Sequence, residues 1–492
     1  MFSAEAVPYV KVGGLADVIG SLAPALENEG AGVQIVIPAY KSISHAGHNI
    51  RPYRNLPGFD TLLGPRRIQA EIFHTTMPHS NVEVFFIGGG HYFYREGIYD
   101  DPLTREGFRD NMERFVFFMK AGLELLLRLG RPIDVIHCHD SQTGLVPGLL
   151  RTHYGYHPLF ARAGVLLTIH NLAYQSIYPV EALSLAGIDE KRYFHPGSPF
   201  EFWGKVNFMK AGIDFADLVN TVSETYAMEI QSGAEYGYGL EGVLKRRSAD
   251  LSGIVNGIDY RVWNPEKDPL LPAHFSSPEQ PGKAICKSAV LKAFGLPQPE
   301  SRVPLAGMVS RLAAQKGFDF MEEVMPELAR LNLQLVILGT GQQKYHDLLQ
   351  VMAERYPGKF GFRPGFDDAL AHQIFAGSDL LLMPSKYEPC GLNQLYSLRY
   401  GTVPVVRATG GLVDTVSDYD PETDTGTGFG FVKYDGGAML MALRRALEVY
   451  SDVPRWMGLA RRGMAQDWSW EKSARKYLSL YKKIYHKRHP LD

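Results

Sequence analysis

The stretch IDVIHCHD (residues 133–140) runs from apolar residues into a polar end, and GVLLTIHN (164–171) repeats this arrangement further along the chain. Short apolar runs bounded in this way are typical of strands buried in parallel sheets. The same kind of run predicts further strands at 33–40, 82–89, 217–224, 304–311, 333–340, 379–386 and 403–410.

Helical patterns alternate with these strands, and the alternation predicts doubly wound, Rossmann-like α/β sheets. Between two of the strands, apolar residues recur at helical spacing and predict the buried face of a helix. These residues are Phe108, Met112, Phe115, Met119, Leu123, Leu126 and Leu129. In the second half, helices are predicted at 319–332, 343–356, 367–377 and 392–400.

The strand and helix pattern starts anew in the second half of the chain, and 492 residues are enough for more than one core. We therefore predict two domains, 1–248 and 249–469. The stretch 264–304 is rich in Pro and Ser and is expected to be a surface excursion. The last segment, 470–492, is expected to contain a long helix that packs across both domains.

The composition is that of an ordinary globular protein, with 45% hydrophobic and 21% charged residues. Because 51 Lys and Arg nearly balance 53 Asp and Glu, the net charge does not favour nucleic acid or a membrane as a partner. No apolar run approaches the ~18–20 residues that span a bilayer, and no signal peptide is recognisable. Cys138, Cys286 and Cys390 are few and lack metal-ligand spacing, which indicates a cytoplasmic protein.

Each half carries a glycine pair at the end of a strand, in KVGGLADV (11–18) and TGGL (409–412). In such sheets ligands sit at the carboxyl ends of strands, and a glycine pair before a helix suits an anion. A helix N-terminus supplies only about half a charge, so Lys11, Arg311 and Lys316 are candidates for holding a diphosphate. From the octapeptide alone, a plain strand-to-helix turn beside a lysine stays equally open.

Two more constellations follow predicted strands. Glu388, in SKYEPCGLNQLYSLRYG (385–401), is placed to bind sugar hydroxyls, the alternative being a carboxylate that complements a helix dipole. HCHD (137–140) and TIHN (168–171) place three histidines, an aspartate and an asparagine at the ends of two adjacent predicted strands. Since they lack a third metal ligand at a recognisable spacing, we expect no metal and favour binding of hydroxyls there.

Taken in order, these motifs resemble those of bacterial glycogen synthases and plant starch synthases, and the resemblance runs over essentially the whole chain. The motifs are KVGGLADV, HCHD, TIHN, YGYGLEG (236–242), VNGIDYRVWNP (255–265), SRLAAQKG, EPCGLNQLY and TGGLVDTV (409–416). The resemblance implies a two-domain GT-B glycosyltransferase with its donor cleft between the domains. It implies transfer of glucose from ADP-glucose to the non-reducing 4-OH of an α-1,4-glucan with retention of configuration, and no cofactor.

The resemblance also implies roles for individual residues. The donor-binding residues would be Lys11, Gly14, Arg311, Lys316, Phe366, Thr409, Gly411 and Leu412. The residues at the reacting sugar would be Glu388, His170 and Asp140, with Asn171 and Asn256 on the acceptor or sugar side. Phe366 replaces a tyrosine that the family usually places against the adenine ring, and stacking there needs no hydroxyl.

Two features depart from the family pattern. The family usually has a threonine at the position of Val12, and only ten residues precede Lys11, which shortens the first strand. The expected mechanism is a front-face substitution in which the departing phosphate helps to deprotonate the acceptor, with Glu388 as nucleophile the less favoured alternative. Two alternative functions also stay open: an α-glucan phosphorylase with pyridoxal phosphate, and a glucan-binding protein without catalysis.

Overall fold

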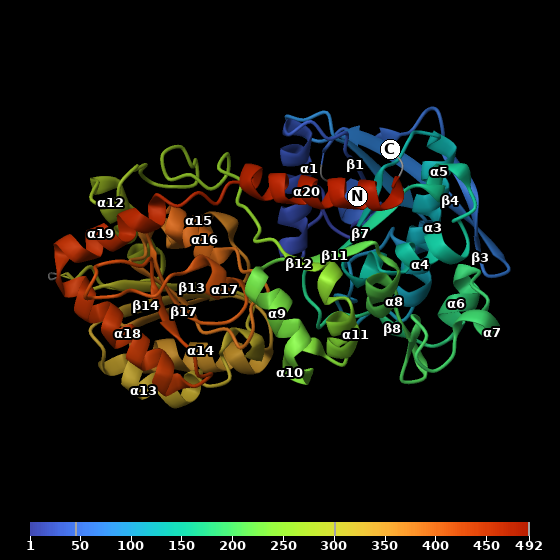
Figure 1. The fold of residues 1–492 in the computed structure, drawn as a ribbon. Coiled ribbons are helices and arrows are strands. Elements are labelled where there is room, and N and C mark those ends of the chain that lie inside the picture. Colours follow the sequence, from blue (N-terminus) through green and yellow to red (C-terminus); the bar gives the residue numbers. More distant parts are fainter. Residues whose placement is uncertain (45–46, 300–301, 491–492) are drawn as a thin grey trace. The chain divides into compact units, whose positions relative to one another are not determined.

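The computed structural model describes residues 1–44, 47–299 and 302–490. The chain forms two compact units: the first contains Met1–Gly257 and the segment from Trp470 onward, and the second contains Ile258–Ser469 (Figure 1). The division lies between Gly257 and Ile258, a short stretch after the expected boundary at 248/249. The first unit extends further because β12 (Leu251–Gly253) pairs in parallel with β11 (Leu218–Thr221).

The first unit has a mixed sheet. Parallel strands run in the order β12-β11-β7-β6 on one side and β1-β5 on the other, and Phe2 pairs in parallel with both Val36 and Cys138 between them. On the far side, β4 runs antiparallel to β5 and to β3, so this edge adds antiparallel strands to the parallel ones that the apolar runs predict. The remaining strands are β1 (Gln34–Pro38), β2 (Arg51–Pro52), β3 (Gly58–Leu63), β4 (Arg66–Thr76), β5 (Glu83–Gly88), β6 (Val135–His139), β7 (Gly164–Ile169), β8 (Ile177–Tyr178), β9 (Glu201–Phe202) and β10 (Lys205–Asn207).

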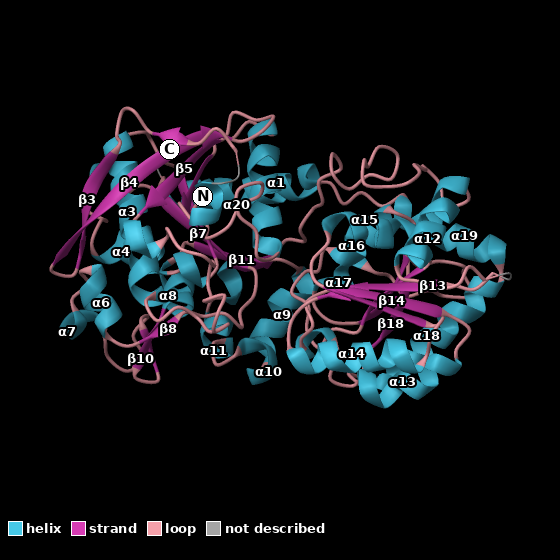
Figure 2. Cartoon of the chain, turned by 180° about the vertical axis from the view of Figure 1, so that it is seen from behind, coloured by secondary structure: helices cyan, strands magenta, loops and turns pink. Residues whose placement is uncertain are grey.

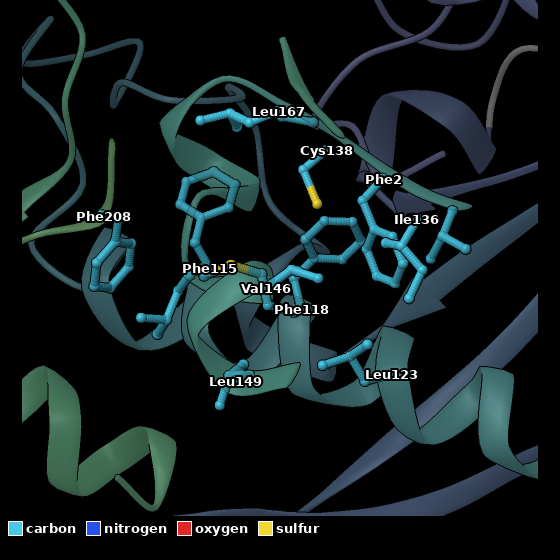
Figure 3. Packing of buried hydrophobic residues seen from close by; sticks show 14 of the residues in the cluster. Phe2, Phe115, Phe118, Leu123, Ile136, Cys138, Val146, Leu149, Leu167 and Phe208 are labelled. Carbon is cyan, nitrogen blue, oxygen red and sulfur yellow. The ribbon is translucent and has the colours of Figure 1, made fainter. Parts of the chain in front are cut away.

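Helices surround this sheet, and the predicted apolar stripe lies on α3 (Asn111–Leu129). Phe115, Met119, Leu123 and Leu126 of that stripe are buried, while Phe108 precedes the helix. Figure 3 shows Phe115, Phe118 and Leu123 in one core with Phe2 and Cys138. The other helices of this unit are α1 (Gly14–Asn28), α2 (Lys41–Ser44), α4 (Leu145–Thr152), α5 (Pro158–Ala161), α6 (Glu181–Ala186), α7 (Glu190–Tyr193), α8 (Phe208–Phe215), α9 (Glu224–Ser232), α10 (Ala234–Gly237), α11 (Glu241–Arg246) and α20 (Trp470–Arg488).

The last helix, α20, lies within the segment 470–492 that was expected to contain a long helix, and it packs on α1 and β7 of the first unit (Figure 1). Trp470, Ala474, Tyr477 and Ile484 form its buried face. This contact explains why the end of the chain groups with its beginning. The expected packing of α20 on the second domain as well stays a prediction.

The second unit is a parallel six-stranded sheet in the order β15-β14-β13-β16-β17-β18. Helices α12, α15, α16 and α19 lie on one face and α13, α14 and α18 on the other (Figure 2). The strands are β13 (Leu305–Val309), β14 (Gln334–Gly339), β15 (Phe360–Pro364), β16 (Leu380–Met383), β17 (Val403–Arg407) and β18 (Phe429–Phe431). The helices are α12 (Pro281–Ala293), α13 (Met321–Arg330), α14 (Gln343–Arg355), α15 (Asp368–Gly377), α16 (Asn393–Arg399), α17 (Gly411–Thr415), α18 (Gly436–Ser451) and α19 (Val453–Met464).

The strands predicted from apolar runs and the helices predicted in the second half are confirmed, whereas the surface excursion expected at 264–304 is wrong in part. That stretch contains α12, whose Lys283 is buried. The Lys283 Nζ lies 3.0 Å from four acceptors, the carbonyl oxygens of Ala376, Ser378 and Tyr400 and the Thr402 hydroxyl oxygen, among which its three N–H groups are shared. These acceptors replace water around the charge and hold α12 against the sheet.

Two findings bear on the predicted environment. All three cysteines, Cys138, Cys286 and Cys390, are free and buried. Among the described residues, no helix is both long enough and apolar enough to cross a membrane.

Candidate active site

The second unit brings its candidate residues together where the strand order reverses. From β13 the chain proceeds to β14 on one side, and β16 lies on the other side of β13. Arg311 and Lys316 follow β13, and Glu388 follows β16. Loops at the carboxyl ends of two adjacent strands that diverge in this way form the usual ligand crevice of an open α/β sheet.

Glu388 and Lys316 form an ion pair in this crevice. The Lys316 Nζ lies 2.5 Å from Glu388 Oε2, and the Ser385 hydroxyl donates to the same oxygen at 2.9 Å. The Glu388 side chain is 8% exposed and the Lys316 side chain 19%. A carboxylate held in one orientation with its charge balanced in this way is pre-organised to accept hydrogen bonds from hydroxyls.

The TGGL loop after β17 packs directly on the backbone around Glu388. The Gly411 N–H donates to the Glu388 carbonyl at 3.0 Å and lies 3.2 Å from that of Pro389, and the Leu412 N–H donates to the Thr409 carbonyl at 3.1 Å. A Cβ on Gly411 would lie 2.2 Å from the Cys390 carbonyl oxygen, so this position needs glycine for close approach. The Gly411 amide therefore joins this loop to the one that carries Glu388, whereas the Leu412 amide closes a turn within the TGGL loop itself.

Phe366 stands apart from these buried residues. It follows β15, next to Gly365 with φ +118°, and 77% of its surface is exposed. A large aromatic ring at the carboxyl end of a strand offers a flat apolar face on which a planar ring can stack.

In the first unit, the loop that carries Lys11 follows the central Phe2 segment. Residues 11–14 are exposed, and α1 begins at Gly14 without a side-chain cap. Lys11 Nζ lies 2.8 Å from Asp17 Oδ1, on the first turn of α1. A Cβ on Gly13 would meet nothing within 4 Å. Unlike Gly411, this glycine leaves open space beside a cation and a helix N-terminus, as an anion site requires.

A buried carboxylate that the sequence analysis did not single out holds this loop. Glu5 is 3% exposed, and its Oε2 accepts the N–H of Val12 and, at 2.9 Å, the N–H of Gly13. Its Oε1 accepts the Tyr99 hydroxyl at 2.6 Å. Burial raises the pKa of Glu5, while the hydrogen bonds from Tyr99, Gly13 and Val12 oppose that rise. Because all of these partners donate, the arrangement suits the ionised carboxylate.

Asp140 follows β6 with a strained backbone, φ +57° and ψ −177°. Non-glycine residues rarely adopt this conformation, and they do so mostly at functional sites. Its Oδ1 accepts the N–H of His170 at 2.7 Å and that of Asn171 at 3.3 Å, so it connects the ends of β6 and β7. Burial raises the pKa of Asp140 to about 7, although these two hydrogen bonds lower it.

His170, Asn171 and Asn256 complete the candidates of the first unit. The His170 ring is half-buried, and its Nε2 lies 3.0 Å from Nδ1 of the buried His139. Burial lowers the pKa of His170 to about 3, so the ring is neutral at physiological pH. The Asn171 Oδ1 accepts the Ala173 N–H at 3.1 Å. Asn256 is buried, and its Oδ1 has no partner among the described residues.

Several supporting residues escaped the sequence analysis. Glu5 is a single acidic residue in the apolar run SAEAVPYV, six positions before Lys11, and this isolation is the signal that could have found it. Ser385 and Tyr99 have no comparable signal, because only folding brings them to Glu388 and Glu5. No group of three or more His, Cys, Asp or Glu that could hold a metal ion occurs within residues 1–44, 47–299 and 302–490.

Comparison with known proteins adds an independent line of evidence. Residues 1–246 match the starch synthase catalytic domain, and residues 297–456 match the glycosyl transferases group 1 domain. The chain is 44% identical to a glycogen synthase of Koribacter versatilis, covering 99% of this chain and 98% of that one. It is 42% identical to a glycogen synthase of Fervidobacterium nodosum, with 98% of each covered.

Solved structures give a similar picture. The catalytic domain of starch synthase IV from Arabidopsis thaliana, bound to ADP and acarbose, superposes with a TM-score of 0.90 at 34% identity, with 98% of each chain covered. A sucrose-phosphate synthase from Thermosynechococcus elongatus has a TM-score of 0.59 at 18% identity, covering 99% of this chain and 98% of that one. The second likeness concerns the fold alone.

Proposed function

Because this chain belongs to the family of glycogen and starch synthases, we propose that it transfers glucose from ADP-glucose to the non-reducing 4-OH of an α-1,4-glucan. It is a glycosyltransferase with the GT-B fold, a glycogen or starch synthase. The relative from Arabidopsis, solved with ADP and acarbose, supports an adenine nucleotide sugar as donor and a glucan as acceptor. The three free, buried cysteines support a reducing compartment, the cytoplasm.

The proposed donor site assigns the diphosphate to cations. The residues assigned to it are Lys11, Arg311 and Lys316. The N-terminus of α1, beginning at Gly14, adds about half a charge. These groups stabilise negative charge that grows on the diphosphate as the bond to the sugar breaks. The exposed ring of Phe366 supports an assignment to the adenine base.

The contact between Lys316 and Glu388 is the single observation that carries this proposal. A cation suited to a phosphate lies 2.5 Å from a buried carboxylate suited to sugar hydroxyls. A nucleotide sugar presents these two groups close together, because the diphosphate is joined to C1 of the sugar and the nearest hydroxyl to the adjacent carbon, C2. Thr409, Gly411 and Leu412 are assigned to the donor site, and the bond from the Gly411 N–H to the Glu388 carbonyl keeps this loop beside the loop that carries Glu388.

The proposed reaction retains configuration. The bond between the glucose C1 and the diphosphate oxygen breaks, and a bond between C1 and the acceptor O4 forms on the same face. The acceptor proton passes to an oxygen of the departing phosphate. His170 and Asp140 are assigned to the reacting sugar, where the neutral imidazole binds an oxygen and the carboxyl group orients the loop after β7. Asn171 and Asn256 are assigned to the sugar or acceptor side.

A radiolabel experiment tests the proposal. Purified protein is incubated with glycogen and either ADP-[¹⁴C]glucose or UDP-[¹⁴C]glucose, and label in precipitated glucan is counted. We expect incorporation from ADP-glucose to exceed that from UDP-glucose, and β-amylase to release the label as maltose. A preference for UDP-glucose would overturn the donor assignment, and no incorporation from either donor would overturn the function.

A further inference from the structure

Three histidines lie together at the ends of β6 and β7, and two of them have no role in the proposed reaction. His137 and His139 are 1% and 0% exposed, and their rings lie 3.9 Å apart. His139 in turn contacts His170. Burial lowers the pKa of all three, so each ring is neutral and has one N–H and one bare nitrogen. The hydrogen-bond partners of each ring then determine which nitrogen carries the proton.

The partners of His137 place its proton on Nε2. Asn220 donates through Nδ2 to the Tyr477 hydroxyl, so its Oδ1 faces Thr168 and accepts that hydroxyl proton at 2.5 Å. Thr168 Oγ1 has only lone pairs left for His137 Nε2, which lies 2.6 Å away and must donate. His137 Nδ1 is then bare and accepts the hydroxyl of Tyr481 on α20, at 2.7 Å.

The partners of His139 place its proton on the other nitrogen. Its Nε2 is buried and finds no hydrogen-bond partner among the described residues. A proton there would create a buried donor without an acceptor, which costs more than a bare nitrogen in the same place. The proton therefore sits on Nδ1, which lies 3.0 Å from His170 Nε2 and donates to it.

The contact between His139 and His170 determines which ring nitrogen of His170 carries the proton. Because its Nε2 accepts a proton from His139, the single proton of the neutral His170 ring sits on Nδ1. No hydrogen bond to Nδ1 occurs within the described parts of the chain, and the side chain is not fully buried. The atom that remains for a ligand is thus a hydrogen-bond donor.

We propose that His139 is a positioning residue that fixes His170 as the Nδ1–H tautomer, so that His170 donates a hydrogen bond to an oxygen of the reacting sugar. The inference rests on the proposed function, because that function places His170 at the sugar. A His170 in this state has no free lone pair and does not act as a general base. This agrees with a reaction in which the departing phosphate takes the acceptor proton.

Nuclear magnetic resonance tests the tautomer directly, without any turnover. The protein is labelled with ¹⁵N-histidine, and long-range ¹⁵N–¹H correlations at pH 7.5 distinguish a protonated ring nitrogen from a bare one. The signals of His170 are assigned by their loss in His170→Gln. We expect protonated Nδ1 and bare Nε2 for His170, and the opposite for His137, which serves as the internal reference. A proton on His170 Nε2, or a doubly protonated ring, would overturn the proposal.

Two variants at one position test the consequence for the reaction. His139→Leu removes the donor, whereas the side-chain amide of His139→Asn can still donate near the position of Nδ1. We expect the leucine variant to lose about tenfold in kcat/KM for the nucleotide sugar, the size of a lost hydrogen bond, and the asparagine variant to recover most of it. His137→Gln is the control: it disturbs the same buried region, and we expect a lower melting temperature with the His170 tautomer unchanged.

The outcomes separate this proposal from the proposed function. If His139→Leu changes the tautomer of His170 and turnover stays normal, His170 does not donate to the sugar and the proposal fails. If wild-type protein has the expected tautomers but incorporates no glucose from either nucleotide sugar, the proposed function fails and the tautomer assignment stands. Should the leucine variant not fold, the wild-type spectrum and the asparagine variant still decide.

Discussion

Lys316 Nζ and Glu388 Oε2 lie 2.5 Å apart, although 72 positions separate the two residues in the chain. They follow β13 and β16, neighbouring strands on either side of the point where the strand order reverses. The lysine that we assign to the phosphate and the carboxylate that we assign to the sugar are thus held together by the sheet itself.

Removal of the Glu388 carboxylate is expected to affect catalysis more than donor binding. Glu388→Ala should lower kcat by about 10²–10³, the range seen when a pre-organised electrostatic group is lost, with a small change in KM. Ser385→Ala is the matched control, because it deletes the 2.9 Å hydrogen bond to Oε2 and leaves the carboxylate. Steady-state kinetics with ADP-glucose measure both. A rise in donor KM alone would make Glu388 a plain binding residue.

Lys11 is expected to contribute charge to the donor site. Lys11→Ala should lower kcat/KM for ADP-glucose about 10- to 100-fold, as expected for a lost charged hydrogen bond, and Lys11→Arg should retain part of it. Lys476→Ala is the control, since Lys476 forms a similar exposed ion pair with Glu224 at 3.2 Å. Turnover of Lys11→Ala at the wild-type rate would mean that KVGGLADV is only a strand-to-helix turn.

Chelation is expected to leave activity intact. Lys11, Arg311 and Lys316 supply the positive charge in the proposed site, so transfer should continue after exhaustive treatment with EDTA. The radiolabel assay checks this on protein passed through a chelating resin, with a metal-dependent enzyme treated alongside as a control. Stimulation of the treated protein by more than about tenfold on adding Mg²⁺ or Mn²⁺ would contradict the assignment of charge to these residues.

Asp140 is expected to make stability depend on pH in a definite direction. Burial raises its pKa from 3.8 to about 7, so between these values the folded protein holds a proton that the unfolded chain releases. The stability that this carboxyl group contributes is therefore full below pH 4 and is lost as the pH rises through 7. Asp140→Asn lacks this titration. Its free energy of unfolding, measured in urea, should therefore rise relative to that of wild type as the pH increases from 5 to 8. A difference that stays constant over this range would refute the assignment.

The two glycine pairs are expected to tolerate alanine differently. A Cβ at Gly411 would lie 2.2 Å from the Cys390 carbonyl oxygen, so Gly411→Ala should destabilise folding by about 1–3 kcal/mol through overpacking. At Gly13 a Cβ meets nothing within 4 Å, and φ is −142°, so Gly13→Ala should fold as wild type does. Urea unfolding of the two variants provides the comparison. Equal stabilities would show that the second pair is not required by packing.

Much of the scaffold could be predicted because its signals are local. The apolar runs in IDVIHCHD and GVLLTIHN form the buried strands β6 and β7, which end at His139 and Ile169. The polar residues that follow lie at the strand ends, as expected. The hairpin of β3 and β4 was missed because its residues are only partly buried and lack a continuous apolar run. Helix α12 was missed because it is weakly amphipathic, and because its buried Lys283 reads as a surface residue in the sequence.

The sequence by itself determined the α/β class, the order of the strands along the chain and the positions of the candidate residues after them. These features depend on periodicity and on residue types at short range, which the chain displays directly. Only the tertiary structure decided which candidates meet: Lys316 with Glu388, Glu5 with the N–H groups of Val12 and Gly13, and His139 with His170. Contacts across a sheet depend on strand order and register. Neither can be predicted from residues that are neighbours in the sequence.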